Sequence, residues 1–156
     1  MFGGAFGAFG TENCHFFDES HPAFRRIAAI TRLRRRTDQV GYALRRGDLY
    51  VREVRYADKF VAPAQGQVAA WSRVAEQASV VVAINTHGNE SRSADITVDS
   101  TPHPGGSRMT VLYRGDWDDA KLDNPPGQES IEATCLEDGR CIIHLDLPPA
   151  GMAILS

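Results

Sequence analysis

The chain has 156 residues, 42% hydrophobic and 24% charged, with a formal net charge of −3. This length allows one hydrophobic core with at most a small appendage. The slight acidity gives no general attraction to nucleic acid or to an anionic membrane, and no apolar run approaches the ~18 residues of a membrane span. We therefore expect no nucleic-acid partner and no membrane partner. The apolar start lacks a preceding Lys or Arg, which argues against a secretory signal and favours the cytoplasm.

Glycines and phenylalanines share the first ten residues, with Gly at positions 3, 4, 7 and 10. Glycine at this density favours irregular backbone over helix. Similar glycine spacings occur in phosphate-binding loops, but no Gly-Lys-Ser/Thr follows. We therefore expect no nucleotide and no other cofactor.

The first regular element is a predicted helix over 22–36. Ser20 or His21 is placed to cap it, and Pro22 lies in the first turn, where its missing N–H costs nothing. Its apolar stripe consists of Ala23, Phe24, Ile27, Ala28, Ile30 and Leu33. The arginines expected on the opposite side are Arg25, Arg32 and Arg36.

The stripe on this helix is too broad for a free surface helix, because monomeric proteins rarely leave a large apolar patch uncovered. We therefore expect another surface to cover it. Its packing or self-association face comprises Phe24, Ile27, Ile30 and Leu33. The pattern ends at Thr37-Asp38 or at Gly41.

From Leu49 onward the hydrophobic period changes to two, which is typical of strands. The strands that we predict are 49–56, 67–74, 79–85, 93–99, 108–113, 131–135, 140–146 and 151–155. The 79–85 segment is apolar on both faces, which predicts a central strand covered on both sides. The Asp138-Gly139 pair predicts a hairpin. About eight short strands indicate a mostly β fold, an antiparallel β-sandwich over 48–156. It follows a segment over 1–47 that consists of the Gly/Phe-rich loop and one α-helix.

Three cysteines, at positions 14, 135 and 141, cannot all pair within one chain. Cys135 and Cys141 flank the predicted hairpin tip, so a disulfide between them is open. We favour two free, half-buried thiols at these positions.

The polar residues contain no convincing catalytic or metal centre. No two histidines have the i, i+4 spacing that puts zinc ligands on one helix face. The acidic group Asp116, Asp118, Asp119 and Asp123 lacks the glycine and the closing glutamate of a calcium loop, which favours a solvated acidic loop. Glycoside hydrolysis needs two carboxyl groups held at a fixed separation, and nothing here has that pattern. We expect no metal site and no catalytic residue.

Two tryptophans are candidates for stacking on a sugar ring. Trp71 lies in the middle of a predicted strand between small neighbours, which indicates a core position. Trp117 lies in a predicted loop that we expect to be exposed. We therefore expect Trp117 to make any sugar contact.

The order of several short segments resembles one enzyme family. The Phe/Gly run over 2–10 and His15-Phe16-Phe17 resemble the loop after the last barrel strand of alpha-amylase-type enzymes of glycoside hydrolase family 13. The segments 21–27 and 43–47 resemble the family's last barrel helix and the joint that follows it. The segments 70–73, 81–88 and 111–117 resemble strands of its C-terminal β-sandwich. The match covers nearly the whole chain, and the order is more specific than any single piece.

This resemblance implies that the helix is left over from a (β/α)8 barrel whose other parts precede it. The family's catalytic carboxylates lie on upstream barrel strands, and no residue here matches them, so this chain alone is expected to have no enzymatic activity. Its implied role is that of a non-catalytic C-terminal domain that stabilises the barrel of a glycosidase acting on alpha-glucans. The implied partners are the missing barrel or a second copy through the helix, with weak alpha-glucan contact. The alternatives are a stand-alone carbohydrate-binding module and an interaction domain unrelated to sugar.

Overall fold

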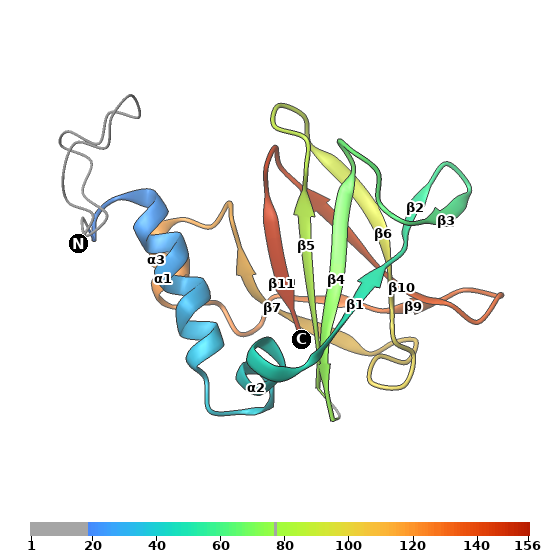
Figure 1. The fold of residues 1–156 in the computed structure, drawn as a ribbon, viewed down its shortest axis with the longest axis horizontal. Coiled ribbons are helices and arrows are strands. Elements are labelled where there is room, and N and C mark those ends of the chain that lie inside the picture. Colours follow the sequence, from blue (N-terminus) through green and yellow to red (C-terminus); the bar gives the residue numbers. More distant parts are fainter. Residues whose placement is uncertain (1–18, 77) are drawn as a thin grey trace.

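A computed structural model describes residues 19–76 and 78–156. The described chain is mostly β, with two stacked sheets and helices gathered at one side (Figure 1). The predictions that concern the glycine-rich start, Cys14 and the His15-Phe16-Phe17 motif lie outside the described residues. None of the described helices is long and apolar enough to cross a membrane.

Two antiparallel sheets form the body of the molecule, which confirms the predicted sandwich. The six-stranded sheet has the order β1 (Asp48–Arg52), β4 (Val68–Ala75), β5 (Ala78–Asn85), β11 (Met152–Leu155), β7 (Arg108–Arg114), β8 (Ser130–Glu132). The five-stranded sheet has the order β3 (Lys59–Val61), β2 (Val54–Tyr56), β6 (Arg92–Val98), β10 (Cys141–Leu147), β9 (Thr134–Cys135). The inward side chains of both sheets form one buried core, in which Ile96, Ile143 and Leu155 are fully buried.

The described residues contain eleven strands rather than the eight that we predicted, because two of the predicted strands are divided between the sheets and β3 was not predicted. The 49–56 segment breaks at Glu53, so that β1 joins one sheet and β2 the other. At the break, Thr97 donates its backbone N–H to the Glu53 carbonyl oxygen over 3.0 Å. The 131–135 segment divides in the same way into β8 and β9. The alternation of apolar and polar residues continues where a strand crosses from one sheet to the other. It therefore does not show which neighbouring strand each half will pair with.

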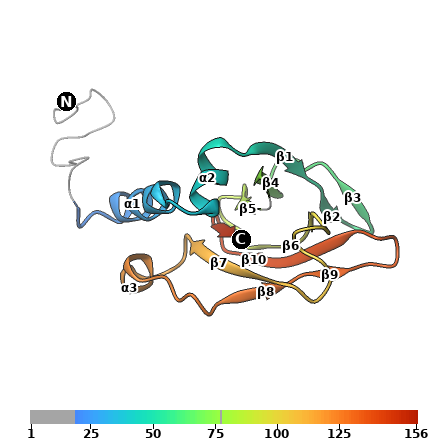
Figure 2. The same cartoon turned by 90° about the horizontal axis from the view of Figure 1, so that it is seen from below.

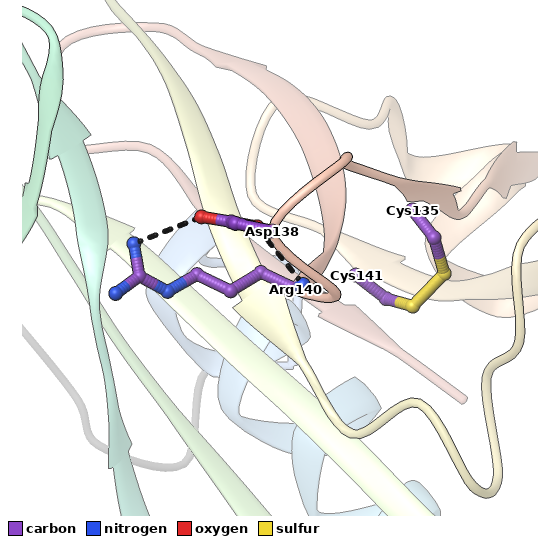
Figure 3. Close-up of a disulfide and its surroundings, with 4 residues drawn as sticks. All are labelled: Cys135, Asp138, Arg140 and Cys141. Carbon is purple, nitrogen blue, oxygen red and sulfur yellow. Dashed lines mark hydrogen bonds and ion pairs between the residues drawn. A yellow bond between two sulfur atoms is a disulfide. The ribbon is translucent and has the colours of Figure 1, made fainter.

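The β9–β10 hairpin confirms the predicted turn. Gly139 has φ +85°, a conformation that L side chains rarely adopt, and it donates its N–H to the Leu136 carbonyl oxygen over 3.0 Å. Behind the turn, Cys135 and Cys141 are direct cross-strand partners with Cα atoms 4.0 Å apart, and they form a disulfide (Figure 3). The expectation of two free thiols is therefore wrong, because the hairpin register places the two side chains opposite each other.

The first helix, α1 (Pro22–Arg35), begins where the sequence predicted. The His21 side chain caps it, since Nδ1 accepts the Ala23 N–H over 3.2 Å. A second helix, α2 (Gln39–Arg46), follows and is capped by Asp38, whose Oδ1 accepts the Gly41 N–H over 3.1 Å. Gly41 thus lies inside a helix rather than ending one. A Cβ atom there would clash with the Arg36 carbonyl oxygen, so the close α1–α2 turn needs glycine.

The α2 helix lies against the six-stranded sheet, whereas α1 extends to the side of the sandwich (Figure 2). The α2 helix packs on β4 and β5, while α1 contacts β7 and a short third helix, α3 (Asp119–Asp123). Ala29 and Leu33 of α1 and Ala43 of α2 belong to the same buried cluster as the sandwich core. The β5 strand is consequently buried on both faces, as predicted, with no residue from Val80 to Ala83 more than 4% exposed.

Candidate functional site

The α1 helix has two different faces, and they divide the predicted packing residues. Leu33 is only 7% exposed, and with Ala29 it packs onto the chain's own sandwich. Ile27 is 64% exposed and lies on the face that points away. Phe24 and Ile30 are half-buried between these extremes. Leu33 is therefore not available to a second chain, which corrects part of the predicted self-association face.

Arginines that we expected on the outer side of α1 instead contact α3. Arg25 Nη1 lies 3.4 Å from Asp119 Oδ2 and 3.5 Å from Asp123 Oδ2. Arg32 Nη2 lies 3.6 Å from Asp123 Oδ1 and donates to the Leu122 carbonyl oxygen over 2.6 Å. Asp119 and Asp123 are four residues apart, so α3 presents both carboxylates on one side. This ion-paired contact explains why the apolar stripe of α1 turns partly outward.

A third arginine fixes the start of α1 on the loop that leads to α3. Arg26 Nε donates to the Gly115 carbonyl oxygen over 3.1 Å, and its Nη1 donates to the Pro22 carbonyl oxygen over 3.1 Å. Hydrogen bonds are directional, so these two bonds restrict the orientation of the helix, which the apolar contact of Leu33 alone would not do. The helix is therefore docked in one orientation rather than lying loosely on the sheet.

The acidic group that was predicted to be a solvated loop has structural roles. Asp116 receives Nε and Nη2 of Arg114 at 2.9 and 3.1 Å, and this paired hydrogen bond holds the pKa of Asp116 below its usual value and raises the pKa of Arg114. Asp118 caps α3 by accepting the Lys121 N–H over 2.9 Å. The sequence contained a signal for this helix, because Asp118 is a favourable N-cap residue.

Trp117 is buried, with 5% of its surface exposed, so the expectation of an exposed ring is wrong. Its ring lies against Tyr113 at a centroid distance of 6.5 Å and an interplanar angle of 58°. A cavity of about 260 Å³ beside it is lined partly by Leu33, Leu122 and Pro125. Because α1 and α3 cover this region, a sugar has no access to the Trp117 ring in this arrangement. Trp71 packs against the core as expected, although part of its side chain is exposed.

A surface open to another body is the outward side of α1, with Ile27 exposed and Phe24 half-buried, whereas Ile30 packs against the core. We call Phe24 and Ile27 the outer α1 face. Of the two, Ile27 is among the most exposed large hydrophobic side chains of the described chain. Burying such a side chain is worth roughly 1.5–3 kcal/mol, which makes this face suited to an apolar partner.

Comparisons with known proteins give little beyond this geometry. No family model matches the chain, and no curated protein matches it. Among solved structures, the chain is similar to a debranching enzyme from Nostoc punctiforme, with 24% sequence identity and a TM-score of 0.42 over 73% of this chain. The matched part is 18% of the length of that enzyme. A likeness this distant supports no statement about the fold or the activity of this chain.

Proposed function

We propose that this chain is the non-catalytic C-terminal part of an alpha-amylase-like glycoside hydrolase, and that its task is to stabilise a barrel domain. The observation that supports this most directly is the two-sided α1 helix. One side is anchored to the sandwich through Leu33 and Arg26, while the outer α1 face carries exposed Ile27. A helix that joins two domains needs both an anchored side and a free apolar side.

The proposed parent acts on alpha-glucans, and this part rests on the ordered segments that resemble glycoside hydrolase family 13. The chain alone is proposed to lack hydrolytic activity. The four aspartates between Asp116 and Asp123 support this, because they are engaged in ion pairs or in capping α3. A hydrolytic pair would instead need one carboxyl group able to give a proton and a second one facing it across the glycosidic bond.

The coding DNA upstream of Met1 provides the decisive test. We expect an in-frame segment that encodes alternating strands and helices and carries the family's Asn-His-Asp motif. In the intact enzyme, Ile27→Glu should lower the thermal midpoint of the barrel, whereas Val61→Glu, a partly exposed apolar position on the distant β3 strand, should not. Upstream DNA without such a segment would contradict the proposal.

A second candidate partner for the outer α1 face is another copy of the chain. The exposed Ile27 side chain favours this when no barrel is present, because an uncovered apolar patch promotes association. Sedimentation of the 156-residue chain tests it. Wild type should contain dimers that Ile27→Glu converts to monomers, and a monomeric wild type would contradict self-association.

A further inference from the structure

A cleft of about 510 Å³ lies at one end of the sandwich, beside the β2–β3 hairpin that projects from the body in Figure 1. Its walls come from β2, from the 62–67 loop and from the loop after β5. The polar and aromatic residues that line it are Arg55, Tyr56, Gln65, Gln67, His87, Arg92 and Ser93. None of them belongs to the α1 surface described above.

The aromatic wall of the cleft is Tyr56, whose side chain is 63% exposed. Its hydroxyl makes no hydrogen bond within residues 19–76 and 78–156, and the same holds for the Gln65 amide. A buried tyrosine normally finds a partner for its hydroxyl, and an exposed ring beside free amide groups can stack on a ligand while the amides bind its hydroxyls.

The loop that carries His87 is held in place from below. Asn85 is 1% exposed, and its Nδ2 donates to the Glu90 and Pro148 carbonyl oxygens, each over 2.8 Å. His87 Nδ1 accepts the Glu90 N–H over 2.9 Å, so Nε2 carries the proton in the neutral ring. Nε2 lies 4.0 Å from Glu90 Oε2, which is beyond hydrogen-bond distance, so the cleft presents an N–H donor on a fixed loop. A site that is already ordered loses less entropy on binding.

The side of the cleft that carries Arg92 is also held by hydrogen bonds, and the charge of Arg92 is compensated. Arg92 Nε donates to the Gly66 carbonyl oxygen over 3.1 Å, which fixes the 62–67 loop. Arg92 Nη1 lies 2.6 Å from Glu90 Oε2, and this hydrogen-bonded pair lowers the pKa of Glu90. Arg55, the other arginine of the cleft, lies 3.6 Å from Asp95 Oδ2. Because both arginines already have an acidic partner, the cleft has no excess positive charge for an anion.

We propose that this cleft binds a neutral saccharide, with Tyr56 stacking on a pyranose ring and Gln65 and His87 hydrogen-bonding its hydroxyl groups. An exposed aromatic ring, the unpaired Gln65 amide and a compensated charge suit a polyhydroxylated neutral ligand better than a phosphate or an apolar peptide. The choice of an alpha-glucan among saccharides rests on the proposed function.

The test is calorimetric titration of the 156-residue chain with maltoheptaose, with cellohexaose as the β-linked comparison. Tyr56→Ala should weaken maltoheptaose binding about tenfold, since loss of a ring contact worth about 1.4 kcal/mol changes the affinity by that factor. Gln65→Ala should weaken it less. Tyr42→Ala is the matched control, because Tyr42 is 50% exposed on α2 and should leave the affinity unchanged.

Circular dichroism should show that all three variants keep the wild-type spectrum, as expected for exposed side chains. No saturable binding of maltoheptaose, or equal losses in Tyr56→Ala and Tyr42→Ala, would overturn the proposal. Equal affinity for cellohexaose would overturn the alpha-glucan assignment. These outcomes leave the barrel-supporting role untouched, since that role is tested by the upstream DNA and by Ile27→Glu in the intact enzyme.

Discussion

The two sheets of the sandwich differ in what lies on their outer faces. In the six-stranded sheet, β5 is buried on both sides, because α2 covers the face that does not meet the core. In the five-stranded sheet, β10 alternates, with His144 and Asp146 exposed between buried Ile143, Leu145 and Leu147. The stability of the first sheet therefore depends on the helices that cover it. The second sheet faces solvent, and a disulfide links its edge strand β9 to β10.

The open sheet carries a polar network where the covered sheet carries helices. His144 Nδ1 lies 2.7 Å from Asp95 Oδ1, and Arg55 Nη1 lies 3.6 Å from Asp95 Oδ2. Exposed ion pairs of this kind contribute little to stability. Changes on the covered side should thus be costly, whereas changes on the open side should be mild.

The largest effect is expected from Leu33→Ala on the covered side. Leu33 is buried between α1 and the sandwich, and removing a buried leucine side chain costs about 2–4 kcal/mol of unfolding free energy. Ile27→Ala on the same helix is the control and should cost less than about 0.5 kcal/mol, because Ile27 is exposed. Urea unfolding measures both, and equal costs would mean that α1 is not docked as described.

The next largest effect concerns the edge of the open sheet. Changing Cys135 and Cys141 together to serine should lower the unfolding free energy by about 2 kcal/mol, because the short loop between them is then no longer closed in the unfolded chain. Before reduction, a thiol assay under denaturing conditions should find at most one free thiol among the three cysteines. Three free thiols would restore the expectation of unpaired cysteines.

A smaller effect is expected where α1 meets α3. Asp123→Asn removes the carboxylate that both Arg25 and Arg32 approach, and it should cost about 0.5–1 kcal/mol at low salt. High salt should reduce the difference, since these groups are partly exposed and therefore screened. Asp138→Asn, which breaks a pair confined to the β9–β10 turn, is the control (Figure 3). A loss that does not depend on salt would point to packing rather than charge.

The smallest expected effects on stability come from two histidines, the buried His103 and the exposed His144 on the five-stranded sheet. Burial lowers the pKa of His103 below its usual 6.5, so its contribution to stability is present above pH 6.5 and is lost as the pH falls toward the folded-state pKa. The hydrogen bond to Asp95 raises the pKa of His144, so its contribution is present below pH 6.5 and is lost as the pH rises through the raised value.

Unfolding free energies measured across pH for two glutamine variants test these signs. His103→Gln should flatten the decline of stability on the acid side, whereas His144→Gln should lose stability relative to wild type only in acid. The same pH dependence in both variants would contradict the opposite environments of the two rings. A His103→Asn variant with the same flattening would show that the lost charge, rather than repacking, is responsible.

The sequence by itself determined the features that depend on neighbours along the chain. His21 and Pro22 mark the start of α1, the apolar run of β5 marks a doubly covered strand, and Gly139 marks the hairpin turn. These signals are short-range, since capping, period and turn conformation are set within a few residues. The mostly β fold was predicted because strand-like alternation and turn residues recur along the chain from Leu49 onward.

Only the tertiary structure decided which surfaces meet. The stripe on α1 was visible in the sequence, but its rotation depends on the aspartates of α3, about ninety residues further along the chain. The same folding buries Trp117, places Cys135 opposite Cys141 and exposes Tyr56 at the cleft. A hydrophobic pattern predicts that a side chain will be buried. Which surface buries it is decided by contacts between segments that are distant in the sequence.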